Sequence, residues 1–187
     1  LSVQFDIQPI AAAVQPPIQM PQVVAGLVIP VLAELDGEPV IRAAVQTGEE
    51  ALDDDARAQL ERLEVHYLSN PEGHLHFALL SDWADAPRER MPGDEDLLTA
   101  LADGIARLNQ RYEGPPGAGS RFLLLHRRRL WNEKEGKWMG WERKRGKLHE
   151  LNRLLRGARD TSFIPIDGQP PAVPRGVRYV LTLDADT

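Results

Sequence analysis

Short apolar runs alternate with amphipathic segments along most of this chain, and this alternation limits its fold more than any other feature. Residues 23–32 are β-branched and nearly all apolar, which is typical of a central parallel strand that is covered on both faces. Residues 74–81, 121–126 and 177–183 also have the character of strands. We predict a strand at each of these four positions and a loop over residues 33–50.

Three segments between these strands have the hydrophobic spacing of a helix. The first begins at Asp53 or Asp54, either of which can cap it, and stops at residues 70–73. The second begins at Asp94, and the third covers residues 144–157. The predicted inward faces carry Ala56, Leu60, Leu63, Tyr67 and Leu68 in the first helix, Leu97, Leu101, Ile105, Leu108 and Tyr112 in the second, and Leu148, Leu151 and Leu155 in the third.

The alternating order of strands and helices predicts an α/β fold, with a mostly parallel, Rossmann-like sheet and helices on both of its faces. Residues 1–22 contain four prolines, few charges and no periodicity. We therefore predict a linker or extension over residues 1–22 and one domain over residues 23–187. Neither end of the chain resembles a natural terminus, so we expect it to be a soluble piece of a longer protein.

Polar clusters follow the predicted strands. Asp82 and Asp85 follow the second strand, a basic block at residues 126–147 follows the third, and Asp184 and Asp186 follow the last. Ligands of parallel sheets bind outside the carboxyl ends of the strands. We therefore expect these clusters to meet in one crevice.

The basic residues of the chain are concentrated in one stretch. The net charge is −6, yet residues 121–160 hold 13 of the 22 Lys and Arg residues and only 5 acidic residues. A local basic block in an acidic chain favours a bound anion over a general nucleic-acid surface, so we expect no nucleic-acid partner. The chain has no cysteine, which excludes disulfides and thiolate metal sites.

The motif Asp184-Ala185-Asp186 is the sharpest chemical signal. An apolar strand ends on two carboxylates at positions i and i+2, whose side chains can point the same way. Oxygen ligands of this kind suit Mg²⁺ or Mn²⁺, which would keep its other coordination positions for water and a diphosphate. The alternative is a solvated acidic turn without a ligand.

Gly146 and Lys147 open the third predicted helix, and Asn152 follows after about one turn. Helix amino termini and nearby cations attract phosphate, so this segment is a candidate phosphate site. The alternative is a basic helix face in contact with water. The run at residues 126–129 has the same two interpretations: it faces a diphosphate, or it is a solvated loop.

Three tryptophans lie in or beside the basic block, at Trp131, Trp138 and Trp141. Their indole rings could stack on a sugar or on uracil. Alternatively, they pack the long segment at residues 127–143 onto the body of the protein. The histidines at positions 66, 74, 76 and 149 do not share the spacing of metal ligands, and we expect structural roles for them.

The segment at residues 147–155 resembles the Lys-Ala-Gly-Ala-Leu-Asn-x-Ala-Leu segment of processive, inverting glycosyltransferases of the GT-A type, where it also precedes an Asp-x-Asp strand. Residues 28–34 resemble a degenerate copy of their Ile-Pro-x-Tyr-Asn-Glu loop, and Asp82 lies where their second strand ends in an acidic cluster. Four stretches more specifically resemble the glycosyltransferase domain of cyclic β-1,2-glucan synthases, namely residues 63–68, 74–83, 124–132 and 140–148.

This resemblance implies transfer of glucose from UDP-glucose to a growing β-1,2-glucan acceptor. The parent protein would be a large synthase in the bacterial inner membrane, with this domain on the cytoplasmic side. The implied metal is Mg²⁺ or Mn²⁺, held by Asp184 and Asp186. The implied nucleotide-sugar-binding residues are Pro30, Glu34, Asp82, Arg145, Lys147 and Asp184.

The catalytic carboxylate, the acceptor subsites and the Gln-x-x-Arg-Trp region of such enzymes lie further along the chain than residue 187. We therefore expect no catalytic residue in this piece, and no transfer by it alone. The loop at residues 28–34 also lacks the Tyr-Asn-Glu of the family. These departures leave an alternative, which is a non-catalytic α/β module that binds a nucleotide or a partner through its basic face.

Overall fold

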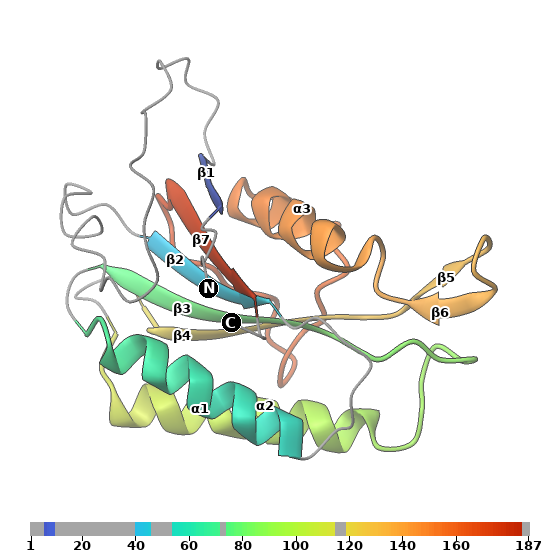
Figure 1. Cartoon of the computed structure of the whole chain (residues 1–187), viewed down its shortest axis with the longest axis horizontal. Coiled ribbons are helices and arrows are strands. Elements are labelled where there is room, and N and C mark those ends of the chain that lie inside the picture. The colour runs from blue at the N-terminus through green and yellow to red at the C-terminus, as the bar shows by residue number, and fades with distance from the viewer. Residues whose placement is uncertain (1–5, 10–39, 46–53, 72–73, 115–118, 185–187) are drawn as a thin grey trace, which may run out of the picture.

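The part of the chain that the structure describes forms a sheet with helices on both faces (Figure 1). The structure is a computed structural model that describes residues 6–9, 40–45, 54–71, 74–114 and 119–184. The elements in chain order are β1 (Asp6–Pro9), β2 (Val40–Val45), α1 (Asp54–Leu68), β3 (Leu75–Asp82), α2 (Asp94–Arg111), β4 (Phe122–Arg127), β5 (Leu130–Asn132), β6 (Lys137–Met139), α3 (Arg143–Leu155) and β7 (Tyr179–Asp184).

The described strands of the main sheet lie in the order β1-β7-β2-β3-β4. Strands β7, β2, β3 and β4 are parallel to one another, and β1 pairs with β7 in the antiparallel sense. A parallel sheet needs helical connections on its faces, and the chain supplies them between β2 and β3 and between β3 and β4. The predicted α/β class is confirmed.

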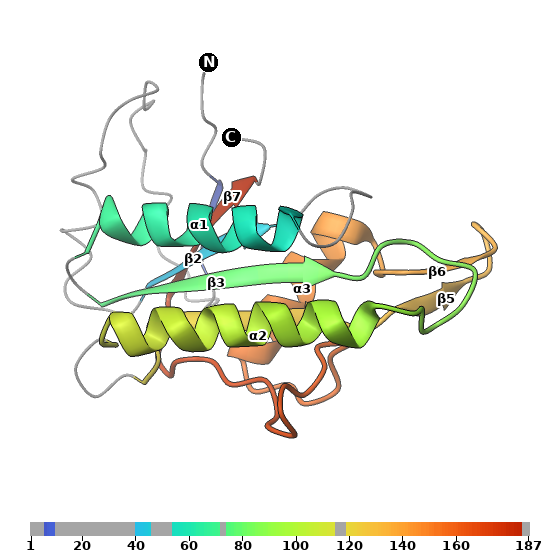
Figure 2. The same cartoon turned by 90° about the horizontal axis from the view of Figure 1, so that it is seen from below.

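Each face of the sheet has its own core because side chains alternate along a strand. Ala78 and Leu80 of β3 pack on the side of α3, where Leu151 is buried. Phe77 and Leu79 face the other way and pack against α1 and α2. Figure 1 shows α3 on one face, and Figure 2 shows α1 and α2 side by side over the opposite face.

The three predicted helices are confirmed, with ends shifted by one or two residues. The second, third and fourth predicted strands correspond to β3, β4 and β7, each shifted towards the carboxyl end of the chain by one or two residues. The first predicted strand, at residues 23–32, lies outside the described residues. The loop predicted over residues 33–50 is wrong at Val40–Val45, which forms β2 between β7 and β3.

Two further elements were not predicted. Asp6–Pro9, within the predicted linker or extension, forms β1 at the edge of the sheet. Strands β5 and β6 form an antiparallel hairpin within residues 127–143, where no strand was predicted. Each of these three strands has only three or four residues, which is too few for a hydrophobic period to be recognised in the sequence.

Candidate functional site at the carboxyl ends of the strands

The carboxyl ends of the parallel strands lie at one edge of the sheet, as predicted. Asp82 ends β3 and lies opposite Arg127, which ends β4. Asp184 ends β7 and lies opposite Val45 of β2. Val45 in turn lies opposite Leu80 of β3, two residues before Asp82. From the usual spacing of strands and residues, the backbones of Asp184 and Asp82 are roughly 12 Å apart. The two predicted acidic positions therefore lie at the same edge of the sheet, on strands that are separated by β2.

Arg127 is fully buried and uses all five of its N–H groups. Its Nε and one terminal nitrogen bind both carboxylate oxygens of Asp82, at 2.6 and 3.1 Å. The remaining N–H groups bind the Glu150 carboxylate at 3.2 Å and the carbonyl oxygens of Trp141 and Arg143, each at 3.1 Å. Arg127 thus joins the end of β3 to α3 and to the segment that leads into it.

Lys147 completes a cluster with Asp82, Arg127 and Glu150. Its Nζ lies 3.1 Å from Oδ2 of Asp82, and its side chain is buried. Burial lowers the pKa of Lys147, and the Asp82 carboxylate opposes part of that shift. Two cations and two carboxylates make the cluster electrically balanced, so the charge of Lys147 is largely neutralised within the protein.

Glu150 connects the cluster to α3. Besides Arg127, its carboxylate accepts hydrogen bonds from the backbone N–H of Ser162, at 2.9 Å, and from the Ser162 hydroxyl. The segment around Ser162 lies along the outer edge of β4, where Arg128 N–H donates to the Ser162 carbonyl. The cluster therefore also fixes the chain that leaves α3.

Two glycines let the backbone approach this cluster. A Cβ atom on Gly140 would lie 2.7 Å from Cγ of Asp82. A Cβ atom on Gly146 would lie 1.8 Å from the carbonyl oxygen of Trp141 and 2.9 Å from a terminal nitrogen of Arg127. The hydrogen bonds that Arg127 donates to Asp82 and to the Trp141 carbonyl thus depend on the absence of a side chain at Gly140 and Gly146.

A second buried arginine, Arg129, fixes the segment that follows β3. It forms a two-pronged ion pair with Asp94, the first residue of α2, at 2.6 and 3.1 Å. It also donates to the carbonyl oxygens of Ala84 and Glu89, at 2.6 and 3.1 Å. Its guanidinium lies over the ring of Trp83, 5.6 Å from the centroid. Arg129 therefore holds residues 83–94 against the end of β4.

His126, which directly precedes Arg127 in the sequence, is also buried. Its Nδ1 shares a 2.8 Å hydrogen bond with the Ser81 hydroxyl, and its ring lies edge-on to Trp83 with centroids 4.0 Å apart. Its Nε2 is buried without a hydrogen-bond partner among the described residues. Burial lowers the pKa of His126 to about 3, because a charged imidazole here would lose its hydration.

This burial predicts an acid-sensitive fold. Below the unfolded-state pKa of 6.5 the unfolded chain binds a proton at His126, whereas the folded chain stays neutral down to about pH 3. Stability is therefore lost as the pH falls from 6.5 towards 3, and at pH 5 the loss from this group is about 2 kcal/mol. The difference between the free energies of unfolding in urea at pH 7.5 and at pH 5 measures this loss.

A His126→Gln variant should lose much of this pH dependence, since its side chain does not titrate. The equivalent change at the exposed His149 should leave the dependence intact. The pKa of His76 is also lowered by burial, and it accounts for part of the remaining slope. Equal pH dependence in His126→Gln and the unchanged chain would contradict this prediction.

The predicted binding residues fall into three groups. Asp82 and Lys147 are brought into contact with each other. Arg145 is exposed and pairs with Glu142 on the surface. The remainder lie outside the described residues or, for Asp184, are described only in their backbone, so the structure does not place the side chains of Pro30, Glu34, Asp184 and Asp186.

Both interpretations of residues 126–129 need correction. Arg127 and Arg129 are neither solvated nor directed at an open site, because each is buried in ion pairs with carboxylates. Within this run only Arg128 is exposed. Arg127 and Glu150 are the residues of the cluster that sequence reasoning missed, and the one available signal was that Arg127 ends a buried strand.

The tryptophans also differ from one another in their surroundings. Trp131 and Trp138 pair across the β5–β6 hairpin, with ring centroids 5.9 Å apart. Trp141 lies before α3 and packs edge-on to His149. Trp131 and Trp141 are 51% and 47% exposed, so neither is used mainly to pack residues 127–143 onto the body.

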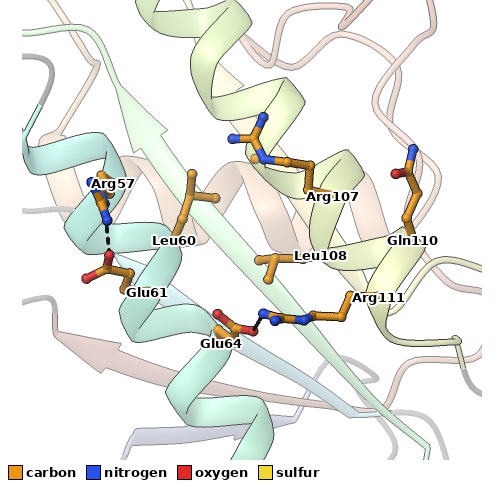
Figure 3. Close-up of a pocket in the computed structure, with 9 residues that line it drawn as sticks. Arg57, Leu60, Glu61, Glu64, Arg107, Leu108, Gln110 and Arg111 are labelled. Carbon is orange, nitrogen blue, oxygen red and sulfur yellow. Dashed lines mark hydrogen bonds and ion pairs between the residues drawn. The ribbon is translucent and has the colours of Figure 1, made fainter.

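A groove of about 530 Å³ lies between α1 and α2, on the side of the sheet opposite α3 (Figure 3). Arg57 pairs with Glu61 along one wall, and Arg111 of α2 reaches across to Glu64 of α1. Asp82, Arg145 and Lys147, the predicted binding residues whose side chains the structure describes, do not line this groove.

Within the described ranges, no group of three or more His, Cys, Asp or Glu side chains is arranged to hold a metal ion. The same ranges contain no helix that is both long and apolar enough to cross a membrane.

The chain is similar to the cyclic β-(1,2)-glucan synthase NdvB of Rhizobium meliloti (strain 1021), with 59% identity over 128 residues. The match covers 68% of this chain and 4% of that protein, so the chain spans a small part of the length of its relative. No protein-family model matches the chain. With this level of identity, the chain is related to a region of a cyclic β-(1,2)-glucan synthase.

Proposed function

We propose that the chain is part of a glucosyltransferase that synthesises cyclic β-(1,2)-glucan, and that it contributes to the binding of the sugar donor. The observation that carries the proposal is the 59% identity to a synthase of that name over 128 residues. The parallel sheet supports it, because such sheets bind ligands at the carboxyl ends of their strands. On this proposal the sheet is the Rossmann-like, nucleotide-binding half of a GT-A fold.

The proposed donor is UDP-glucose, and the acceptor is the growing glucan. Asp184 and Asp186 would hold Mg²⁺ or Mn²⁺, since paired carboxylates suit hard divalent cations. The ion would offset the charge of the diphosphate. The other candidate residues remain those proposed for the nucleotide sugar, namely Pro30, Glu34, Asp82, Arg145 and Lys147.

The burial of these residues separates those that can contact the donor from those that hold the fold in place. Arg145 is exposed in the first turn of α3, so it can reach a diphosphate by leaving its partner Glu142. Lys147 and Asp82 are buried against each other. We therefore assign this pair to holding α3 against the strand ends, with direct contact to the donor left mainly to Arg145 and the two later carboxylates.

The whole protein is proposed to be a large synthase of the bacterial inner membrane, with this part on the cytoplasmic side. The groups that perform transfer would come from elsewhere in that protein. We expect this chain alone to bind donor without transferring glucose.

Calorimetric titration of the purified chain with UDP in the presence of Mn²⁺ tests this function. We expect saturable binding that weakens about tenfold in Asp186→Asn, because one metal ligand is lost, and about fivefold in Arg145→Ala. Arg128→Ala, which removes an exposed arginine that pairs with no carboxylate among the described residues, should bind as the unchanged chain does. Unchanged affinity in both Asp186→Asn and Arg145→Ala would exclude the proposed site.

A specific observation favours a second candidate, a non-catalytic α/β module that binds a nucleotide or a partner. Asp82, Arg127, Lys147 and Glu150 neutralise one another, so the strongest polar cluster of the described residues has a structural role. Nucleotide binding that is independent of Mn²⁺ and of Asp186, or no nucleotide binding at all, would favour this candidate.

A further inference from the structure

The β5–β6 hairpin projects from the end of the sheet (Figures 1 and 2). Each of its strands carries one tryptophan. Trp131 and Trp138 lie directly opposite each other across the two strands. Their rings are inclined at 59°, with centroids 5.9 Å apart, and half of the Trp131 surface is open to solvent. An indole in this position leaves apolar surface in contact with water, which is unfavourable unless a ligand covers it.

The hairpin is fixed to the body, so the tryptophan pair has a defined position. Trp138 exchanges two backbone hydrogen bonds with Ala86, each of 2.9 Å. Lys137 forms a 2.8 Å ion pair with Asp85. Met139 is buried, and because side chains alternate along a strand, Met139 and Lys137 occupy the face opposite that of the two tryptophans.

The turn of the hairpin is also ordered by its own side chains. The amide oxygen of Asn132 accepts hydrogen bonds from the backbone N–H groups of Lys134 and Glu135, at 3.0 and 3.3 Å. Its amide nitrogen lies 3.2 Å from the sulfur of Met139. The aromatic pair is therefore preorganised before any ligand arrives, which lowers the entropy cost of binding.

The charges around the pair exclude a strongly anionic ligand. The turn carries Glu133, Lys134 and Glu135, and Lys137 follows, which gives two acidic and two basic residues. Anionic lipid surfaces and nucleic acids require a net positive patch, which this hairpin lacks.

The apolar surface near the pair is also too limited for docking of another protein. Among the described residues, the large hydrophobic side chains with the greatest exposure are Val65, Leu68, Trp131 and Trp141. The two aliphatic ones belong to α1, which covers one face of the sheet away from the hairpin (Figure 2). Among the described residues, no exposed large aliphatic side chain therefore lies on the hairpin with Trp131.

We propose that the Trp131–Trp138 pair is a binding site for a neutral saccharide chain. A pyranose ring has an apolar face of C–H groups, which can stack on an indole, and a rim of hydroxyl groups, which can bond to the polar residues of the turn. The identification of that saccharide as β-(1,2)-glucan rests on the proposed function. The site lies on the hairpin and does not include the residues proposed to bind UDP.

Titration of the isotope-labelled chain with linear β-(1,2)-linked gluco-oligosaccharides tests the proposal by NMR. The four tryptophans supply four indole N–H signals. We expect the signals of Trp131 and Trp138 to shift saturably at millimolar saccharide, and those of Trp83 and Trp141 to stay in place. Trp131→Ala should weaken binding by about fivefold or more, and Trp131→Phe should retain part of the affinity.

Trp141→Ala is the matched control, because Trp141 is exposed to a similar extent but is not part of the hairpin. Its affinity for the oligosaccharide should equal that of the unchanged chain. Absence of shifts, a shift centred on Trp141, or unchanged affinity in Trp131→Ala would overturn the proposal. Shifts of the Trp131 signal that follow protein concentration alone would instead identify a second copy of the chain as the occupant, and would also overturn it.

The proposed function and this site can fail separately. Trp131→Ala should bind UDP and Mn²⁺ with unchanged affinity. If the chain binds the oligosaccharide but not UDP, the donor-binding proposal fails and the saccharide site stands. If it binds UDP but not the oligosaccharide, the opposite holds.

Discussion

Replacing Arg127 with alanine is expected to lower the free energy of unfolding by about 3–5 kcal/mol. The change leaves the carboxylates of Asp82 and Glu150 without their buried cation, and it removes the donors to two carbonyl oxygens. Lys147 remains as a counter-charge for Asp82, but a lysine beside one oxygen does not replace five directed N–H groups. Urea denaturation followed by circular dichroism measures the loss.

Two variants make this prediction specific. Arg128→Ala removes the exposed neighbouring arginine and should change stability by no more than about 0.5 kcal/mol. Arg127→Lys keeps the charge but not the planar set of donors, so it should recover only part of the loss. If Arg127→Ala were as stable as Arg128→Ala, the cluster would not hold α3 against the strand ends.

Replacing Gly146 with alanine is expected to destabilise the chain by about 2–3 kcal/mol, although alanine favours helices. The new Cβ atom would lie 1.8 Å from the carbonyl oxygen of Trp141, a backbone atom that cannot turn aside. The same carbonyl accepts a hydrogen bond from Arg127, so relief of the clash by backbone movement would break that bond. The predicted result is a lower midpoint of urea denaturation.

Gly104→Ala is the matched control within a helix. A Cβ atom at Gly104 would approach Leu60 to 2.1 Å, but the atom it meets is the end of a flexible side chain at the rim of the groove between α1 and α2. Leu60 can change its rotamer, and the gain in helix propensity offsets part of the cost. We expect a change within about 1 kcal/mol. Equal losses in both variants would contradict the importance of the Trp141 contact.

The helices could be predicted from sequence because the spacing of hydrophobic residues within each segment is sufficient to indicate a helix. The stripe Leu101, Ile105 and Leu108 is buried as its spacing predicts, and α2 begins at Asp94. Strand β2 could not be predicted in this way, because residues 40–45 are short and include Arg42. It is a strand because β3 and β7 pair with it on both sides, and those strands are distant in the sequence.

The sequence predicted where in the fold the residues of the candidate site lie, but not which of their side chains pair with each other. The sequence placed Asp82 at a strand end, which is confirmed. It placed Gly146 and Lys147 at the opening of a helix, but α3 begins at Arg143, so Lys147 lies past its first turn. It could not show that the two side chains pair with each other, because their contact depends on how α3 lies on the sheet. For the same reason Arg127 and Arg129 were interpreted as free charges, although buried carboxylates bind them.

The position of β7 within the sheet determines the order in which a newly made chain can complete its fold. Strand β7 lies between β1 and β2, although it is the last described element to be synthesised. On the ribosome, β2, β3 and β4 can pair as soon as their two helices have emerged, because each has a neighbour from nearby sequence. Strand β1, the first of the described strands, pairs with β7 and has to wait for it, and such long-range pairing is slow. Among the described strands, β7 and β1 therefore join the sheet last, and until then one side of β2 lacks its partner strand, so that misassembly can begin there.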